Sequence, residues 1–184
     1  MSTGLFAERD GWSLYAYAAF GDAFEGLSDA VEDLRKKQPE SYESHPKAKL
    51  LRRIIELILD EIPRDPNGAA YQLGNTLGGA HRHWRRAKFL GRFRLFYRFS
   101  TAHKAIVYAW VNDETTLRKA GSRTDPYASF NKRLRDGDPP DGWDDLFRKA
   151  VVGRPIVAAA AFQAAKPAEK PAAGRIARPT FRCF

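Results

Sequence analysis

The sequence predicts an α+β domain in which two N-terminal helices pack on one face of a mostly antiparallel sheet, with a further helix towards the C-terminus. Three observations support this prediction. The first third of the chain repeats its apolar residues at helical spacing. The middle third alternates apolar and polar residues, as strands do. A segment rich in Pro, Gly and Asn, residues 64–79, separates the two patterns and is interpreted as a connecting loop.

The region before this loop is expected to form one short strand and two amphipathic helices. The aromatic run 12–17 is interpreted as a strand or an extended entry segment. The first helix ends near Gln38-Pro39, and the second runs from about Pro46 to Ile62, where Pro63 stops it. Their apolar stripes should supply much of the core. These stripes comprise Phe20, Phe24, Leu27, Val31 and Leu34 in the first helix, and Leu51, Ile54, Ile55, Ile58 and Ile62 in the second.

The sheet is expected to contain three strands after the loop. Residues 84–90 and 92–100 are separated only by Gly91, which favours a tight turn between antiparallel strands. Residues 105–111 are apolar throughout, as expected of a central or fully covered strand. Side chains alternate along the second of these strands. Phe93, Leu95, Tyr97 and Phe99 should therefore point to one face, and Arg94, Phe96 and Arg98 to the other.

The last folded element is a helix with clear start and stop signals. Asp125 is a good N-cap, Pro126 suits the first helical position, and Gly137 closes the helix. One or two amphipathic turns follow around Trp143, after which the chain is rich in Ala, Pro, Lys and Arg. We therefore expect one domain over residues 1–150 and a basic, disordered tail over 151–184.

Composition limits the classes of function. No apolar run approaches the roughly 20 residues that a membrane-spanning helix needs, so no membrane partner is expected. Cys183 is the only cysteine, which fits a reducing cytoplasm. The net charge is −4 over residues 1–65, +8 over 66–150 and +5 over 151–184. Positive charge in one part of a chain favours contact with a polyanion, and nucleic acid is the first candidate.

The strongest local signal is the stretch from His81 to Lys104, which holds eight Lys or Arg residues, six aromatic residues and no acid. Arg86 and Lys88 should share one face of a strand, and Arg94 should lie on the neighbouring strand. Such cations bind phosphates, and interleaved aromatic rings stack on unpaired bases, as in the recognition of single-stranded RNA. The alternative is a solvated strand face without a ligand.

Cleavage of RNA needs little more than this set of side chains. The 2′-hydroxyl can attack the adjacent phosphorus if a protein orients it, removes its proton, stabilises the added negative charge and protonates the leaving oxygen. Arg suits charge stabilisation, and a Lys among several cations is a plausible proton acceptor because its charged form is disfavoured. Lys88 fits this description. A Tyr or His could donate the proton or orient the substrate.

A metal centre is not expected. His81, His83 and His103 are the obvious candidate ligands, but no Cys or acidic residue accompanies them in the sequence. Three imidazoles in a basic segment would also have to overcome the repulsion between the segment and a cation. We therefore predict neither a metal nor another cofactor.

Several runs of the chain together resemble one known family. They are Gly11-Trp12-Ser13-Leu14-Tyr15-Ala16, residues 84–89, 91–98 and 110–118, and the later runs 124–127 and 137–140. Over roughly residues 11–148 the chain resembles the YhaV-type toxins of bacterial toxin-antitoxin modules, which are similar to the wider class of RelE-like ribonucleases. The basic tail after Ala150 departs from the family, which normally finishes soon after the Trp143 segment.

The resemblance implies a RelE-like fold and an mRNA-cleaving toxin without metal or cofactor, neutralised by an antitoxin of the AbrB-like type. It implies single-stranded RNA as substrate, free or on the ribosome, and contact with operator DNA only through the antitoxin complex. Its site residues, carried over by position, are Arg86, Lys88, Arg94, Arg118, Lys119 and Tyr127 as the catalytic set, with His83, Arg85, Arg92 and Arg98 binding RNA.

Two questions stay open at the level of the sequence. The general base could be Lys88, Tyr127 or His83, because the family varies at these positions. The rival function is a non-catalytic RNA- or DNA-binding subunit of a repressor complex, which would bind with the same dependence on salt.

Overall fold

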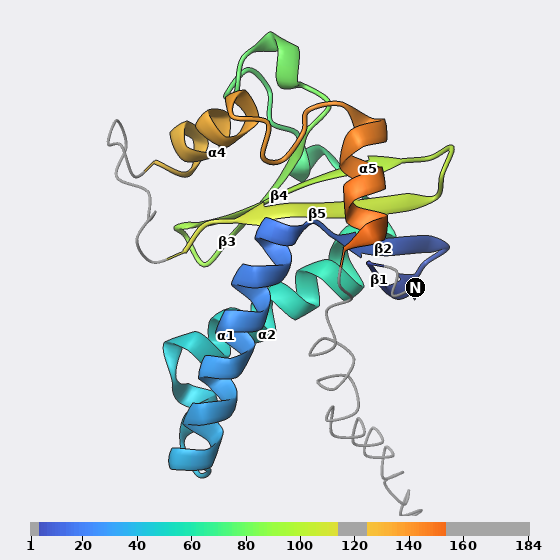
Figure 1. The fold of residues 1–184 in the computed structure, drawn as a ribbon. Coiled ribbons are helices and arrows are strands. Elements are labelled where there is room, and N and C mark those ends of the chain that lie inside the picture. The colour runs from blue at the N-terminus through green and yellow to red at the C-terminus, as the bar shows by residue number, and fades with distance from the viewer. Residues whose placement is uncertain (1–3, 114–124, 154–184) are drawn as a thin grey trace, which may run out of the picture.

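A five-stranded sheet lies between two groups of helices in the computed structural model, which describes residues 4–113 and 125–153 (Figure 1). The strands are β1 (Leu5–Arg9), β2 (Trp12–Ala16), β3 (Arg85–Phe89), β4 (Phe93–Ser100) and β5 (Ala105–Val111). Their order in the sheet is β1-β2-β5-β4-β3. β2 and β5 are parallel and the other neighbouring strands are antiparallel, so the predicted α+β fold with a mostly antiparallel sheet is confirmed.

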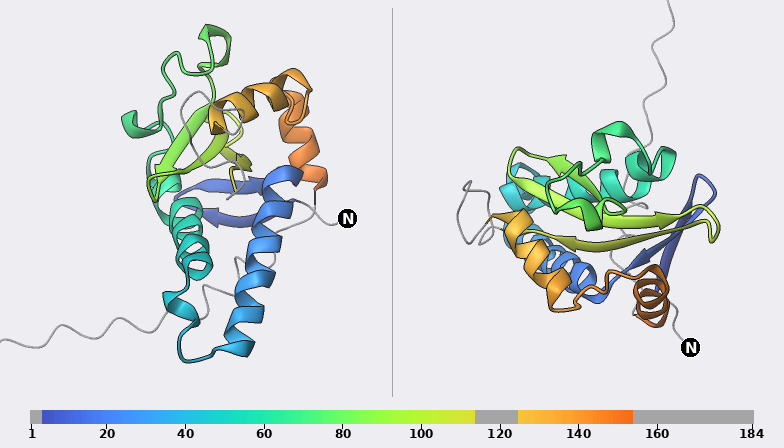
Figure 2. Two further views of the ribbon diagram at one scale, coloured as in Figure 1. Left: turned by 90° about the vertical axis from the view of Figure 1, so that its left-hand side faces the viewer. Right: turned by 90° about the horizontal axis from the view of Figure 1, so that it is seen from above.

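The helices are α1 (Ala18–Lys37), α2 (Pro46–Glu56), the π-helical turn η2 (Leu57–Glu61), α3 (Ile62–Arg64), α4 (Pro126–Arg135) and α5 (Trp143–Val152). Short 3-10 turns are η1 (Tyr42–Ser44), η3 (Ala69–Tyr71) and η4 (Gly79–His81). Figure 1 shows α1 and α2 on one side of the sheet and α4 and α5 on the other, and Figure 2 shows the same layers from two further directions. Among the residues described, no helix is long and apolar enough to cross a membrane.

The two N-terminal helices form where the apolar spacing predicts them. α2 begins with a side-chain cap, because the His45 imidazole Nδ1 accepts a hydrogen bond from the Lys47 amide at 3.2 Å. Pro63 does not stop the helical path, which continues through η2 into α3 and ends at Arg64, two residues beyond the expected end at Ile62. Pro63 lies in the first turn of α3, where a missing amide hydrogen is tolerated.

β3 and β4 form the predicted hairpin. Leu90 and Gly91 both have positive φ, 43° and 72°, which the tight turn between right-twisted strands requires. The register places Lys88 opposite Arg94. Every residue of β5 is buried, as expected of a strand with a neighbour on each side and helices on both faces.

The two faces of the sheet carry separate cores. Leu95 and Tyr97 of β4 point into the core with α1 and α2, whereas Phe96 points into the core with α4 and α5. This confirms the predicted alternation, and the C-terminal helices α4 and α5 pack on the face opposite to α1 and α2. Phe130 of α4 and Leu146 of α5 are fully buried in the second core, so these helices partly cover the face with the cations. The aromatic side chains on that face need such cover.

The N-terminal strand β1 was not predicted from the sequence, because its five residues show no clear alternation. It extends the sheet beyond β2 and joins the C-terminal helix, since the Gly4 amide donates to the Val151 carbonyl at 2.7 Å. A Cβ atom on Gly4 would lie 1.8 Å from the carbonyl oxygen of Ala150, so only glycine fits this approach. α5 ends at Val152, so the first two residues of the predicted tail, 151–184, belong to this helix. Residues 154–184 of that tail lie outside the described residues.

A buried tyrosine connects the start of α1 with the segment after α4. The Tyr17 hydroxyl donates to Asp138 Oδ1 at 2.8 Å, and the other carboxylate oxygen accepts from Arg133 at 3.0 Å. Burial, together with the Asp138 carboxylate, raises the pKa of Tyr17 to about 12. The phenol therefore remains a hydrogen-bond donor over the whole physiological range of pH.

Phe130 provides a test of the second core. Its ring stacks on Phe96 with a centroid distance of 4.1 Å and meets the ring of Trp84 edge-on at 5.0 Å. We expect Phe130→Ala to lower the free energy of unfolding by about 3–5 kcal/mol, and Phe130→Leu to lower it less. Urea unfolding monitored by tryptophan fluorescence measures both changes. A loss below about 1 kcal/mol for the alanine variant would show that α4 does not pack on this face.

Candidate active site

The hydroxyl of Tyr127 lies between two guanidinium groups. Arg86 Nη1 donates to this oxygen at 2.6 Å and Arg94 Nε donates to it at 3.3 Å. Tyr127 occupies the first turn of α4, where its amide donates to the N-cap carboxylate of Asp125 at 3.4 Å. Because the phenol oxygen accepts from both arginines, its own hydrogen is left for a third group.

Arg86 is a buried side chain of β3, with only 7% of its surface exposed. Its guanidinium lies over the ring of Tyr127, 5.6 Å from the centroid. Nη2 is at 3.5 Å from the carbonyl oxygen of Gln72, and the buried Nε has no hydrogen-bond partner among the described residues. A buried donor without a partner is costly in a folded protein, and an anion at this position would satisfy it.

Arg94 is buried even more deeply, with 3% of its surface exposed. Nη1 donates to the carbonyl oxygens of Gly91 at 3.1 Å and Phe93 at 2.6 Å. The backbone at Arg94 is held by Asn112 at the end of β5, whose Oδ1 accepts from the Arg94 amide at 2.5 Å. Asn112 is not among the residues predicted from the sequence. A polar residue directly after an apolar strand, next to a basic strand, is the signal that could have found it.

Lys88 completes a group of three cations on one face. It lies opposite Arg94 in the strand register and two residues after Arg86, so alternation puts all three side chains on the face that α4 covers. Lys88 is exposed, unlike the two arginines. Within residues 4–113 and 125–153, no salt bridge to a carboxylate involves any of the three. The group can therefore bind a phosphate with two fixed guanidiniums and one mobile ammonium.

The remaining predicted catalytic residues, Arg118 and Lys119, fall in the segment 114–124, which lies outside the described residues. Before that segment Asn112 bonds the backbone of Arg94, and after it Asp125 caps the turn that carries Tyr127.

Two of the residues predicted to bind RNA lie in a different cluster. His83 Nε2 is 2.9 Å from Asp141 Oδ1, and Arg98 donates to the Asp141 carbonyl oxygen. The Arg98 guanidinium also lies over the rings of Trp84 and Trp143, 5.7 Å from each centroid. Burial lowers the pKa of Arg98, against the opposing effect of the Asp141 carboxylate. These contacts give Arg98 a structural role at the far end of β4.

Asp141 itself collects three hydrogen bonds on one oxygen. The Trp84 indole donates at 2.7 Å, and His81 Nδ1 lies at 3.0 Å beside the His83 contact. Burial alone would raise the pKa of the Asp141 carboxyl, but the hydrogen bonds from Trp84, His83 and His81 outweigh this effect and lower it. The carboxylate is therefore ionised at neutral pH.

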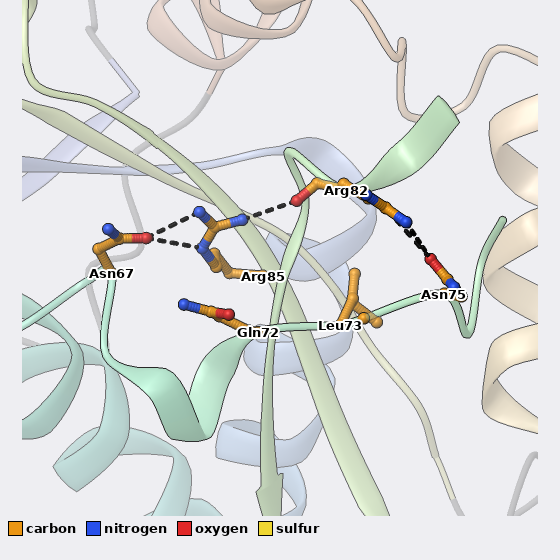
Figure 3. Close-up of a pocket in the computed structure, with 7 residues that line it drawn as sticks. Asn67, Gln72, Leu73, Asn75, Arg82 and Arg85 are labelled. Carbon is orange, nitrogen blue, oxygen red and sulfur yellow. Dashed lines mark hydrogen bonds between the residues drawn. The ribbon is translucent and has the colours of Figure 1, made fainter. Parts of the chain in front are cut away.

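The other two predicted RNA-binding residues are accessible. Arg92 is exposed in the β3–β4 turn. Arg85 points to the opposite face of β3 from Arg86 and is held by Asn67, whose Oδ1 accepts from Nε at 3.2 Å and from Nη2 at 2.7 Å. Figure 3 shows Arg85 at a hollow of about 520 Å³, where Arg82 is bound in the same way by Asn75. Amides and guanidiniums dominate this hollow, which therefore offers hydrogen-bonding groups of the kind that meet base edges and phosphates.

Comparison with known proteins agrees with the geometry. Residues 14–151 match a family of toxins with endonuclease activity, of toxin-antitoxin systems. The chain is 41% identical over 147 residues to a ribonuclease toxin YhaV of Escherichia coli strain K12, covering 78% of this chain and 96% of the relative. A toxin YhaV of E. coli O6:H1 is 41% identical over 144 residues, covering 77% and 94%. No solved structure matches the chain. The match begins within β2 and extends through β3, β4 and β5 into α5, and the chain belongs to the YhaV family of toxin-antitoxin endonucleases.

Proposed function

We propose that this toxin is a metal-independent endoribonuclease that cleaves single-stranded RNA, and mRNA in particular, by attack of the 2′-hydroxyl on the adjacent phosphate. The observation that carries the proposal is the Tyr127 hydroxyl held between the buried guanidiniums of Arg86 and Arg94. The name of the E. coli K12 relative, a ribonuclease toxin, supports RNA as the substrate. Inhibition of translation and growth would follow from the loss of mRNA.

In the proposed mechanism the scissile phosphate lies against Arg94 and Arg86. Both guanidiniums are fixed before substrate binds, Arg94 by two backbone carbonyls and Arg86 by Tyr127, so little reorganisation accompanies the rise in negative charge on phosphorus. The unpartnered Nε of Arg86 would gain an acceptor in this state. Electrostatic stabilisation of this kind is often the largest single contribution to catalysis.

Proton transfer is assigned to the two remaining groups. Lys88 takes the proton from the 2′-hydroxyl as its oxygen bonds to phosphorus, and Tyr127 donates a proton to the 5′-oxygen as the P–O bond breaks. The products are a 2′,3′-cyclic phosphate and a 5′-hydroxyl. Of the other candidates for the base, His83 contacts Asp141 at the far end of the sheet face, which favours Lys88. Arg118 and Lys119 remain proposed contributors to charge stabilisation.

Substrate on either side of the cleaved bond would meet Arg92 in the β3–β4 turn and Arg85 beside the polar hollow. An antitoxin is the natural protein partner, because the family acts in toxin-antitoxin systems. We propose an AbrB-like antitoxin with acidic side chains that cover the cations, with operator DNA bound only by the complex. The cytoplasm is the proposed location, since the RNA substrate is there.

Removing the phenol oxygen provides the sharpest test of the site. Tyr127→Phe keeps the ring that packs against Phe96 but deletes the group between the arginines, and we expect cleavage of a single-stranded RNA to fall by roughly 10²–10⁴-fold. Lys88→Ala should show a loss in the same range, because the lysine is exposed and its removal leaves the core intact. Initial rates of cleavage of a labelled RNA measure both effects.

The matched control for Lys88→Ala is Lys49→Ala, an exposed lysine of α2 on the opposite side of the sheet. It carries the same change of charge and should cleave at the wild-type rate. If the cleavage rate fell equally in Lys49→Ala and Lys88→Ala, the loss would come from the change in net charge, and Lys88 would have no role in the mechanism. Arg94→Lys retains the positive charge and tests whether the fixed guanidinium is needed.

The chemistry of the substrate gives an independent prediction. An oligonucleotide with a single 2′-deoxy residue at the cleaved position should bind as RNA does but remain intact, since the nucleophile is missing. Cleavage of unmodified RNA should persist in excess chelator, at a temperature at which circular dichroism shows the chelated protein to be folded. Mass spectrometry of the products should find the cyclic phosphate. Cleavage at the 2′-deoxy position would exclude 2′-hydroxyl attack, and binding without products from any RNA would support the non-catalytic repressor subunit.

Growth provides the corresponding test in cells. Expression of the chain without an antitoxin should arrest bacterial growth, and Tyr127→Phe should relieve the arrest at equal protein level. The reason is that the variant folds but does not cleave mRNA. Colony counts with matched immunoblots measure this, and an equally toxic, soluble Tyr127→Phe variant would separate toxicity from the proposed site.

A further inference from the structure

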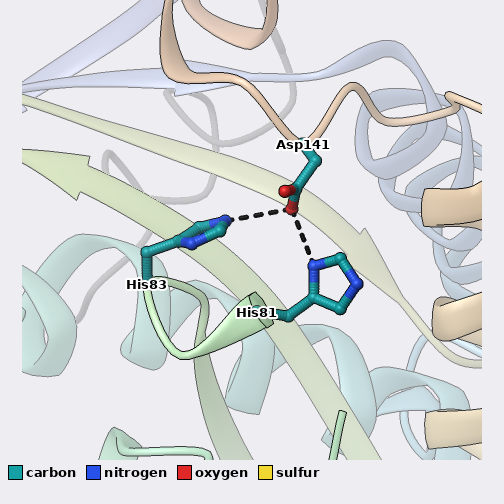
Figure 4. Close-up of side chains that lie close together, drawn as sticks. All are labelled: His81, His83 and Asp141. Carbon is teal, nitrogen blue, oxygen red and sulfur yellow. Dashed lines mark hydrogen bonds and ion pairs between the residues drawn. The ribbon is translucent and has the colours of Figure 1, made fainter. Parts of the chain in front are cut away.

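Two histidines and one carboxylate converge at the far end of the sheet face that carries Tyr127. Figure 4 shows the rings of His81 and His83 pointing to the same carboxylate oxygen of Asp141. His81 Nδ1 lies 3.0 Å and His83 Nε2 2.9 Å from Asp141 Oδ1, and the three atoms all lie within 4.8 Å of one another. The histidines precede β3, whereas Asp141 comes from the turn between α4 and α5.

The separations suit direct ligands of a small ion. Zinc binds imidazole nitrogen and carboxylate oxygen at about 2.0–2.2 Å, which places neighbouring ligand atoms of a tetrahedral centre roughly 3.3 Å apart. The two observed nitrogen–oxygen separations are a few tenths of an ångström shorter, so small rotations of the side chains would open space for the ion. Two imidazoles and one carboxylate form a ligand set that transition metals prefer over magnesium or calcium.

The surroundings hold Asp141 in place independently of the histidines. The Trp84 indole, which is fully buried, donates to the same carboxylate oxygen at 2.7 Å, and Arg98 donates to the Asp141 backbone carbonyl. Partners of this kind orient a metal-binding group and are part of the design of many metal sites. The three side chains are 21%, 35% and 40% exposed for His81, His83 and Asp141, so an ion can enter and a water can complete its coordination.

We propose that His81, His83 and Asp141 form a binding site for one divalent transition-metal ion of the zinc type. No acidic residue accompanies the histidines in the sequence, and Asp141 supplies one from 58 residues beyond His83. In the described part of the chain this is the one group of three such residues close enough to share an ion.

The site is separate from the proposed cleavage centre. On β4, Arg98 contacts Asp141 of the proposed metal site, whereas Arg94 contacts Tyr127 of the proposed cleavage centre. These two arginines are four residues apart, which corresponds to roughly 13 Å along a strand. Phe96 lies between them on β4, and its ring stacks on Phe130 in the second core. The ion would therefore act on structure, by tying the start of β3 to the α4–α5 turn, while the side chains around Tyr127 carry out cleavage.

Metal binding to the full chain tests the proposal directly. Protein stripped with a chelator and then dialysed should bind one equivalent of Co²⁺ with the visible absorption of a tetrahedral site, and Zn²⁺ should displace it. Zinc at about 100 times its Kd should raise Tm by roughly 5–10 °C, since it binds only the folded chain. Neither readout depends on RNA cleavage, so the result is independent of the proposed catalytic mechanism.

Variants distinguish a built site from adventitious binding. His81→Ala and His83→Ala should each weaken zinc binding by more than the roughly 10–100-fold expected when an outer partner is lost, and should abolish the shift in Tm. His103→Ala is the matched control, because His103 bonds Ser100 and Trp143 rather than any of the three proposed ligands, and it should bind like wild type. If wild type binds Co²⁺ no better than His81→Ala, or if Tm does not respond to zinc, the three side chains form a hydrogen-bonded contact and the proposal is overturned.

Discussion

Two guanidiniums are buried side by side on one face of the sheet, and no described carboxylate neutralises them. Arg86 and Arg94 are 7% and 3% exposed, and their visible partners are backbone carbonyls and the hydroxyl of Tyr127. Burial of charge without a counter-charge is unfavourable, and proteins retain it where an anion is to be bound. α4 packs on this face through two contacts. Its first turn brings Tyr127 to both arginines, and Phe130 in its middle stacks on Phe96 of β4.

Much of this could be predicted from the sequence. Helical spacing located α1 and α2, and period-two alternation located β3 and β4 and correctly put Arg94 and Phe96 on one face. The sequence could not show that this face is covered, because an amphipathic helix such as α4 reveals its apolar side but not the side of the sheet on which it packs. The burial of Arg86 and Arg94 depends on that choice, and so does the contact with Tyr127.

Contacts between distant segments account for the other differences. Asp141 lies 60 residues beyond His81, so no local pattern joins the two. Asn112 directly follows the apolar strand β5, and its side chain holds the backbone of Arg94. In each case the residue type was ordinary at its position. Its importance comes from the tertiary neighbour, which local pattern does not encode.

The helix α4 connects the two ends of this sheet face, with Tyr127 at one end and the turn that carries Asp141 at the other. α4 begins at the residues that place Tyr127 and is followed by the turn that carries Asp141, while its middle is fixed by Phe130. Hydrogen bonds between that turn and the start of β3 restrain the C-terminal end of α4, which is only about 15 Å long. The first turn of the same helix holds the Tyr127 hydroxyl 2.6 Å from Arg86 and 3.3 Å from Arg94. The contacts of Asp141 and the stacking of Phe130 on Phe96 therefore both fix α4 on the sheet face that carries the two arginines.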